Sequence, residues 1–231
     1  AVAADLDGWV AQVREDVATT FAQLQSRLAA LAQVAQAPGA PEAAPLAARL
    51  LSSREALLAR IDACRPADDC GVAKTRLHGD YHLGQVLIAE RDFVIVDFEG
   101  EPGRSIAERR AKHSALRDVA GMLRSFSYAA AVALDAAATD RPDDRARLAP
   151  YAAGWRQAAE SAFLSAYLDV LDDAPVRART EHDTRALIEL FAIEKALYEV
   201  RYELANRPAW VVVPVEGLLE ILDAPRQGAP A

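Results

Sequence analysis

The chain has 231 residues, a formal net charge of -8 and a composition that is 52% hydrophobic but only 6% aromatic. These values favour a mainly helical protein with a substantial core, built as one large domain or two small ones. The negative charge argues against nucleic-acid partners, and no apolar run is long enough to span a membrane. Without a signal-peptide pattern, we expect a cytoplasmic protein.

The first 63 residues are predicted to form a helical hairpin. Apolar residues recur every three or four positions from residue 5 to about 36, which is the pattern of a helix with one buried stripe. A Pro- and Gly-rich segment, 37–41, ends this helix. A second helix is expected from Pro45 to Ala63, packed antiparallel to the first. Neither helix carries an obvious reactive group, so we interpret both as scaffold.

Two cysteines, Cys64 and Cys70, follow in a polar linker. They could close a small disulfide, but two reduced thiols are the preferred interpretation for a cytosolic chain. A zinc site would need further ligands, and none cluster nearby in the sequence.

Residues 77–101 combine short apolar runs with polar side chains that can carry chemistry. Two strand-like runs, 86–88 and 93–96, flank a connection of turn length, which predicts a β-hairpin. Such a hairpin brings Asp80, Gln85 and Asp97 to one end of its ladder. Two carboxylates and one carboxamide at one place suit a general base and a site for a hard metal ion.

The order and spacing of these three residues match kinase-type phosphoryl transfer. Asp80 is the candidate catalytic base, which orients and deprotonates the attacking hydroxyl. Gln85 and Asp97 are the candidate ligands of Mg²⁺, which bridges the phosphates of ATP. The protein-kinase pattern has Arg after the His and Asn as the amide, whereas this chain has Gly79 after His78 and Gln85 as the amide.

Three further polar residues surround the base. His78 is expected to support the loop through its ring nitrogens rather than to act as a base. A packing role is favoured for His82 over a chemical one. Glu99 is a candidate for hydrogen bonding to substrate or to water.

The next segments read as a charged connection and two helices. Residues 100–113 either shape the substrate groove or form a solvated turn of helix. Residues 115–138 predict a helix with small residues on its inner face. Asp118 lies beside its apolar stripe, where an unpaired carboxylate is costly, so we expect it to accept hydrogen bonds from backbone donors; the alternative is an exposed Asp118. A helix over 145–171 has this candidate core: Leu148, Tyr151, Trp155, Phe163 and Tyr167.

The last long helix, 181–206, carries charges in the middle of its apolar side. Glu194 and Arg201 lie two turns apart with Tyr198 between them, and Tyr202 flanks the set. Charges on an apolar face must be paired or must line a cavity. These four residues therefore predict either a sugar-binding wall or a buried structural ion pair, and the sequence leaves both open.

Taken together, the motifs resemble those of the bacterial maltokinases, which group with the aminoglycoside-phosphotransferase-like kinases and are often fused to trehalose synthase. The resemblance rests on residues 78–87 and 97–102, and it continues through these segments: 108–110, 116–126, 194–203 and 206–208. It implies an α+β fold, mainly α with a small β-hairpin, like the C-terminal lobe of these kinases. It also implies that Asp118 steadies the catalytic loop, that maltose is converted to maltose 1-phosphate for trehalose and glycogen metabolism, and that trehalose synthase is a possible partner.

The Gly-rich sheet and strand lysine that hold ATP in such kinases are not recognisable before residue 77, and there is no Walker-type loop. We therefore interpret residues 1–231 as a single C-lobe without its nucleotide lobe, and expect weak ATP binding and poor turnover in isolation. Its parts are the helical hairpin, 1–63, the catalytic and metal-binding loops, 75–113, and a helical substrate-binding part, 115–231. The alternatives are a non-catalytic sugar-docking or assembly module of a trehalose synthase fusion, and a glucosamine- or aminoglycoside-type kinase.

Overall fold

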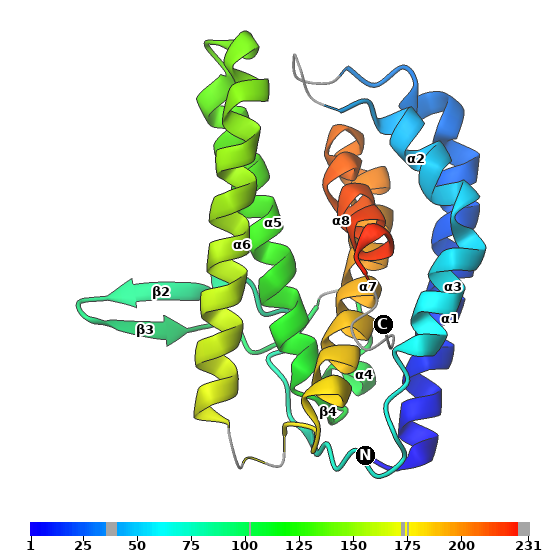
Figure 1. The fold of residues 1–231 in the computed structure, drawn as a ribbon, viewed down its shortest axis with the longest axis vertical. Helices are drawn as coiled ribbons and strands as arrows, with labels where there is room; N and C mark the ends of the chain where they lie inside the picture. The colour runs from blue at the N-terminus through cyan, green and yellow to red at the C-terminus, as the bar shows by residue number, and fades with distance from the viewer. Residues whose placement is uncertain (36–40, 102, 172–173, 175, 226–231) are drawn as a thin grey trace.

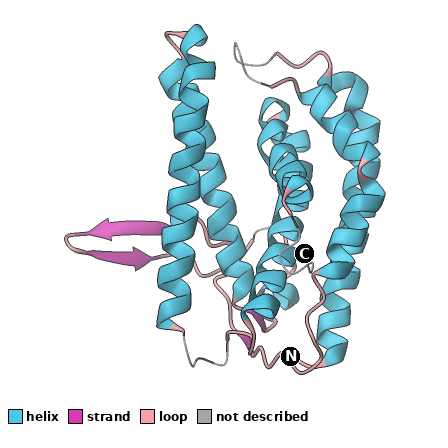
Figure 2. Ribbon diagram, viewed as in Figure 1, coloured by secondary structure: helices cyan, strands magenta, loops and turns pink. Residues whose placement is uncertain are grey.

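The fold of the chain was obtained as a computed structural model that describes residues 1–35, 41–101, 103–171, 174 and 176–225 (Figure 1). Most of the turn expected at 37–41 and Pro102 of the kinase-like motif lie outside the described residues. Helices dominate, as Figure 2 shows, and the strands form two small antiparallel pairs. The α+β prediction, mainly helical with a small hairpin, is confirmed.

The elements follow one another in this order: α1 (Ala3–Leu31), α2 (Ala43–Ser52), α3 (Arg54–Ala63), β1 (Lys74–Thr75), β2 (Val86–Ala89), β3 (Asp92–Ile95), α4 (Ile106–Arg110), β4 (His113–Ser114), α5 (Leu116–Ala138), α6 (Arg145–Val170), α7 (Glu181–Asn206) and α8 (Val212–Asp223). A short 3-10 turn, η1 (Leu83–Gln85), precedes β2.

Helix α7 is the centre of the fold. Helices α1, α5 and α8 pack against it, and α6 packs on the outer side of α5 (Figure 1). Apolar side chains along α7 are fully buried, among them Leu187, Leu190 and Leu197. The helix begins at Thr180, whose hydroxyl accepts a hydrogen bond from the backbone N–H of Asp183. The bounds predicted for this helix, 181–206, are confirmed.

The predicted second helix of the N-terminal hairpin is two helices. The break lies at Ser53, between α2 and α3. The hydroxyls of Ser52 and Ser53 both hydrogen-bond to the backbone carbonyl of Arg49, so two serine side chains compete for a helical acceptor. Both helices still pack against α1, as the helical hairpin required.

The candidate core of α6 is only partly correct. Phe163 and Tyr167 are half-buried against the core, but Tyr151 is 73% exposed and Trp155 is 49% exposed. Helix α6 is an outer helix, so only the side chains toward α5 find cover. The aromatic spacing alone did not show that the helix packs mainly against α5.

The two cysteines form no disulfide, in agreement with the interpretation preferred from the sequence, but both are buried rather than set in a polar linker. The Cys64 thiol lies 3.2 Å from Glu189 Oε1. Among the described residues no helix is long and apolar enough to cross a bilayer.

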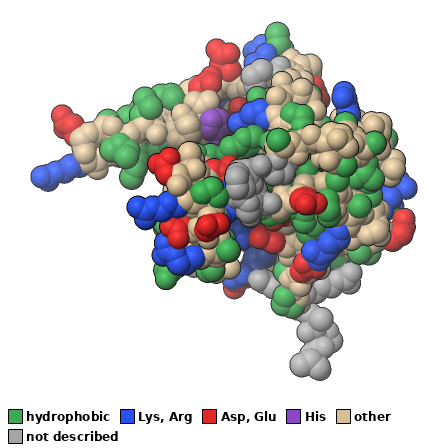
Figure 3. Space-filling view, turned by 90° about the horizontal axis from the view of Figure 1, so that it is seen from above, with side chains coloured by type: hydrophobic (Ala, Val, Ile, Leu, Met, Phe, Trp, Pro, Cys, Tyr) green, Lys and Arg blue, Asp and Glu red, His purple; other side chains and the backbone are tan. Residues whose placement is uncertain are grey.

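The predicted hairpin is β2 paired with β3, in a register that places Val86 opposite Ile95 and Ile88 opposite Phe93. It projects sideways from the helices (Figures 1 and 3). Large apolar side chains on it are exposed, including Ile88 at 80% and Phe93 at 67%. A two-stranded hairpin has little stability of its own, so the anchoring of its ends decides where the polar residues of this segment lie.

Candidate active site

His78 anchors the loop that carries Asp80. Its ring is buried, and Nε2 donates a hydrogen bond to the backbone carbonyl of Val96 at 2.7 Å. Because that nitrogen carries the proton, Nδ1 can accept the hydrogen bond from the backbone N–H of Asp80 at 3.3 Å. The imidazole thus ties the loop before β2 to the end of β3, in the position expected of a support.

Asp118 fixes the same loop from α5. Its two carboxylate oxygens accept hydrogen bonds from the backbone N–H groups of His78, at 2.8 Å, and Gly79, at 2.9 Å. Burial raises the pKa of Asp118, and these two backbone donors partly oppose the rise. The backbone partners expected for this carboxylate are therefore present. Because Asp118 holds the backbone of His78 and Gly79, it also fixes the backbone from which the Asp80 side chain extends.

The loop of Asp80 touches the segment that follows β3. Gly79 has a φ of +84°, and a Cβ there would lie 3.1 Å from the Cα of Gly100, whose φ is +77°. Both positions favour glycine because of their left-handed backbone, and the first also because of the close approach. Asp97, in the same segment, has a φ of +64° without being glycine. Such non-glycine outliers gather at functional sites.

Gln85 and Asp97 meet at the base of the hairpin, where Gln85 Nε2 donates a hydrogen bond to Asp97 Oδ2 at 2.9 Å. A carboxylate and a carboxamide are hard oxygen donors, and Mg²⁺ in kinase sites takes few protein ligands besides phosphate oxygens and water. The pair therefore fits a magnesium ion shared with a nucleotide. No group of three or more His, Cys, Asp or Glu suited to a metal occurs among the described residues.

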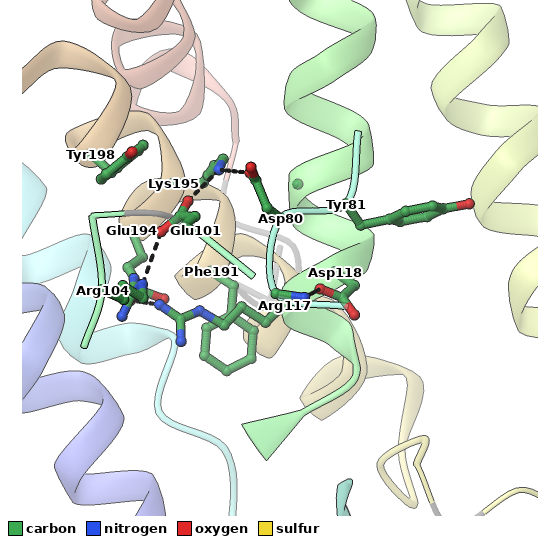
Figure 4. Close-up of a pocket in the computed structure, with 12 residues that line it drawn as sticks. Asp80, Tyr81, Glu101, Arg104, Arg117, Asp118, Phe191, Glu194, Lys195 and Tyr198 are labelled. Atoms are coloured by element: carbon green, nitrogen blue, oxygen red, sulfur yellow. Dashed lines mark hydrogen bonds and ion pairs between the residues drawn. The ribbon is translucent and has the colours of Figure 1, made fainter. Parts of the chain in front are cut away.

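Asp80 lines a small pocket, in which its carboxylate points toward Lys195 of α7 (Figure 4). The pocket encloses about 30 Å³, enough for roughly one or two water molecules. Its lining is mostly charged or aromatic: Gly79, Asp80, Tyr81, Glu101, Arg104, Arg117, Asp118, Gly121, Phe191, Glu194, Lys195 and Tyr198. We call it the Asp80 pocket. Gln85 and Asp97 are not among its lining residues.

Ion pairs fill the Asp80 pocket. Lys195 Nζ donates to Asp80 Oδ1 at 3.2 Å and to the carboxylate of Glu101. Arg104 pairs with Glu101 at 2.9 Å and with Glu194 at 3.3 Å. Glu194 is also paired with Arg117. Three cations and three carboxylates from four segments of the chain thus neutralise one another around the candidate base.

The four α7 residues expected to act together are divided by the structure. Glu194 and Tyr198 line the Asp80 pocket. Tyr202 stacks on Tyr198, with ring centroids 6.4 Å apart, but is 46% exposed. Arg201 turns to α1 instead, where it bonds to Asp16 at 3.0 Å and to the Thr20 hydroxyl at 2.6 Å.

Neither of the two interpretations of this face is right as stated. Glu194 and Arg201 do not pair with each other, because each has partners on another element. Only the first half of the proposed wall lies at the pocket. On the side of α7 opposite this face, Glu199 and Glu203 are buried, and they bond to Arg124 and Arg207.

Two other expected residues lie at the edge of the site. Glu99 is exposed, and its backbone carbonyl accepts a hydrogen bond from Arg109. His82 caps the η1 turn by accepting from the backbone N–H of Gly84, while its Nε2 lies 4.0 Å from Asp80 Oδ2. His82 therefore shapes the loop more than it packs into the core.

Sequence reasoning missed Glu101 and Lys195 as site residues. Both stand within the motifs that carry the resemblance, but neither has a local feature that marks it. The available signal was helical phase, because residues 194 and 195 lie four and three positions before residue 198 and so both neighbour it on the helix surface. Arg104 and Arg117 were also missed. They belong to the charged connection and to the first turn of α5, and only the folded chain brings both to Glu194.

Three features are those predicted for a kinase-type site: the supported loop, the carboxylate facing a pocket and the amide–carboxylate pair at the base of a hairpin. Comparison with known proteins agrees. A glucosamine kinase from Streptacidiphilus jiangxiensis is 30% identical over 227 residues, which are 96% of this chain and 44% of that enzyme. A glucosamine kinase from Mycolicibacterium smegmatis is 33% identical over 157 residues, which are 68% of this chain and 36% of that enzyme.

A solved structure of glucosamine kinase in complex with glucosamine, ADP and inorganic phosphate matches with a TM-score of 0.69 at 26% identity, over 96% of this chain and 46% of that chain. No protein-family model matches the chain. The chain thus spans less than half the length of the curated relatives it matches. It is related to sugar kinases and shares their kinase-like fold, while the narrower resemblance to maltokinases stays a prediction.

Proposed function

We propose that this chain carries the catalytic base and the acceptor side of an ATP-dependent kinase that phosphorylates a sugar hydroxyl. The observation that carries the proposal is the placement of Asp80: its loop is fixed by Asp118 and His78, and its carboxylate faces a small pocket lined largely by charged and aromatic residues. A carboxylate held in this way can accept the proton of an attacking alcohol. The Gln85–Asp97 pair lies at the end of the adjoining hairpin, where the phosphates would be held.

The division of labour follows from these positions. Asp80 orients the acceptor hydroxyl and takes its proton. A magnesium ion held by Gln85 and Asp97 would neutralise charge on the phosphates of ATP. Glu194 and Tyr198 offer a carboxylate and an aromatic face at the pocket, groups suited to sugar hydroxyls and to a pyranose ring. Because the Asp80 pocket is small, it would form the floor of the acceptor site, with the rest of the sugar lying above it.

Two acceptors are candidates. Glucosamine is favoured by the similarity to glucosamine kinases, one of them solved with glucosamine and ADP. Maltose is favoured by the motifs shared with maltokinases. The alternative of a non-catalytic module of a trehalose synthase fusion predicts no transfer with either sugar.

Binding of ATP would need a lobe that encloses the nucleotide, and the described residues do not form one. Both faces of the β2–β3 hairpin are apolar and exposed, a surface that a nucleotide-binding lobe could cover. We therefore propose that fast turnover requires such a lobe and that this chain alone binds ATP weakly.

The test compares Asp80→Asn with a matched control, Asp92→Asn, at the exposed start of strand β3. Both variants are made in this chain joined to a nucleotide-binding lobe. Phosphoryl transfer from Mg-ATP to glucosamine and to maltose is followed by ³¹P NMR, and sugar binding by calorimetry. We expect D80N to lose turnover by about 10²-fold or more, because general bases contribute that much, while sugar binding and the melting temperature stay near those of D92N. Turnover by D80N equal to that of D92N would contradict the assignment of the base.

A further inference from the structure

Lys195 connects the two loops of the site. It rises from α7 with its side chain 21% exposed and places its ammonium between Asp80 and Glu101 (Figure 4). Asp80 belongs to the loop before β2, whereas Glu101 belongs to the segment after β3. The ring of Tyr198 lies 5.0 Å from the same nitrogen. One cation thus joins the segment of the candidate base to the segment that follows the candidate metal ligand Asp97.

The contact is ionic at neutral pH. Burial opposes the charged form of Lys195, but the carboxylates of Glu101 and Asp80 outweigh it and raise the pKa of the ammonium. Burial also opposes the charged form of Glu101, whose side chain is 5% exposed, but Lys195 and Arg104 outweigh it and lower its pKa. Each group of the pair is therefore stabilised as an ion by the other.

The two carboxylate oxygens of Asp80 have different surroundings. Oδ1 accepts the hydrogen bond from Lys195 at 3.2 Å. Oδ2 lies 4.0 Å from His82 Nε2, which is too far for a hydrogen bond. A cation on one oxygen fixes the rotation of the carboxylate and directs the other oxygen away from α7.

We propose that Lys195 and Glu101 are positioning residues for phosphoryl transfer: Glu101 holds Lys195, and Lys195 holds Oδ1 of Asp80 so that Oδ2 meets the acceptor hydroxyl. The inference rests on the proposed function for its catalytic consequence. It makes Lys195 neither the base nor a sugar ligand, and its effect on the rate passes through Asp80.

The first test needs only this chain. The ¹³C signal of the Asp80 carboxyl carbon, assigned by its loss in D80N, is recorded in Lys195→Met, Lys195→Arg and a control, Lys74→Met. Lys74 also makes a carboxylate ion pair, with Asp5 at 2.6 Å, but outside the pocket. We expect the Asp80 signal to move in K195M, to move less in K195R and to stay in place in K74M. An Asp80 signal that is the same in K195M and K74M would overturn the proposal. If K195M does not fold, Glu101→Gln removes the other half of the bridge and should move the same signal.

The second test measures transfer from Mg-ATP to the sugar per folded molecule. We expect kcat to fall on the order of 10- to 100-fold in K195M, since small misplacements of a catalytic group have effects of this size. The KM for the sugar should change by no more than about threefold, and K195R should recover part of kcat. Equal kcat in K195M and K74M would overturn the positioning role. Because fast turnover is proposed to need a nucleotide-binding lobe, transfer is measured with this chain joined to such a lobe. Absence of transfer in that unaltered protein would count against the proposed function, while the NMR result would still decide whether the bridge holds Asp80.

Discussion

His113, in β4, shows how one buried residue sets the response of the protein to acid. Its ring stacks on Trp9 at 4.5 Å between centroids and meets the edge of Phe191 at 5.1 Å. Nδ1 accepts a hydrogen bond from the backbone N–H of Ser114. Burial, together with the charges of Arg117 and Arg104, lowers the pKa of His113 to about 3. Between about pH 6.5 and pH 3 the side chain therefore stays neutral in the folded protein, although it would be protonated in the unfolded chain.

His113→Phe should flatten the pH dependence of stability between pH 6.5 and 3. In this window the unfolded chain binds a proton at His113 and the folded chain does not, so the histidine makes the fold less stable as the pH falls. The difference approaches roughly 4–5 kcal/mol across the whole window. Urea unfolding at several pH values measures it. Parallel stability curves for H113F and the unaltered chain would show that the ring is not buried as a neutral group.

At the same scale, local and distant pairings differ in how well the sequence predicts them. Asp80, Gln85 and Asp97 were predicted as site residues from their spacing around one hairpin, and the structure brings two of them into contact, Gln85 and Asp97. The partners of Arg201 lie 181 and 185 positions away, and those of Lys195 lie 94 and 115 positions away. Helical phase shows which side such a charge occupies, but the partner is fixed only by the packing of α7 against other elements.

At the scale of elements, α5 and α8 approach each other where Gly217 makes room for Arg124. A Cβ at Gly217 would lie 2.1 Å from Arg124 Nη1. That guanidinium cannot easily move aside, because it is 5% exposed and hydrogen-bonded to Glu199 at 2.9 Å. One buried ion pair, Arg124–Glu199, thus joins α5 to α7, and α8 packs against it at Gly217. A hydropathy pattern does not reveal this contact.

Gly217→Ala should destabilise the fold by about 1–3 kcal/mol, the usual effect of overpacking. The control is Gly154→Ala in α6, where a Cβ meets nothing within 4 Å and removal of a helix-interior glycine should stabilise by roughly 0.5–1 kcal/mol. Denaturant unfolding distinguishes the two variants. If G217A is as stable as G154A, the contact between α8 and Arg124 is looser than the structure shows.

At the scale of the molecule, the helices form the stable body and the β2–β3 hairpin extends from it (Figure 3). The pattern of apolar residues was enough to predict this division, because helices and hairpin have different periods. It was not enough to predict that both faces of the hairpin are uncovered by the rest of the described chain. An apolar run in the sequence predicts a strand, but whether the faces of that strand are buried depends on which other elements pack against it.

Replacing Ile88 and Phe93 together by Ser should leave the free energy of unfolding within about 0.5 kcal/mol, as for other exposed positions, and should reduce self-association in light scattering. Both side chains are mostly exposed, so their removal gives up few contacts. Leu197→Ala, at a fully buried position of α7, should instead cost about 2–5 kcal/mol. A comparable loss in the hairpin double variant would mean that the hairpin folds back onto the body.

Helix α7 carries Glu194, Lys195 and Tyr198 within little more than one turn. The α7 side of the pocket is therefore a single stiff unit. Asp80 instead belongs to a loop whose position depends on separate contacts with His78, Asp118 and Lys195. Closely related proteins that differ in acceptor preference should then show a nearly fixed arrangement of these three helix positions relative to one another. Their structural variation should gather in the loops that face the helix, which is where selection for a new acceptor would act first.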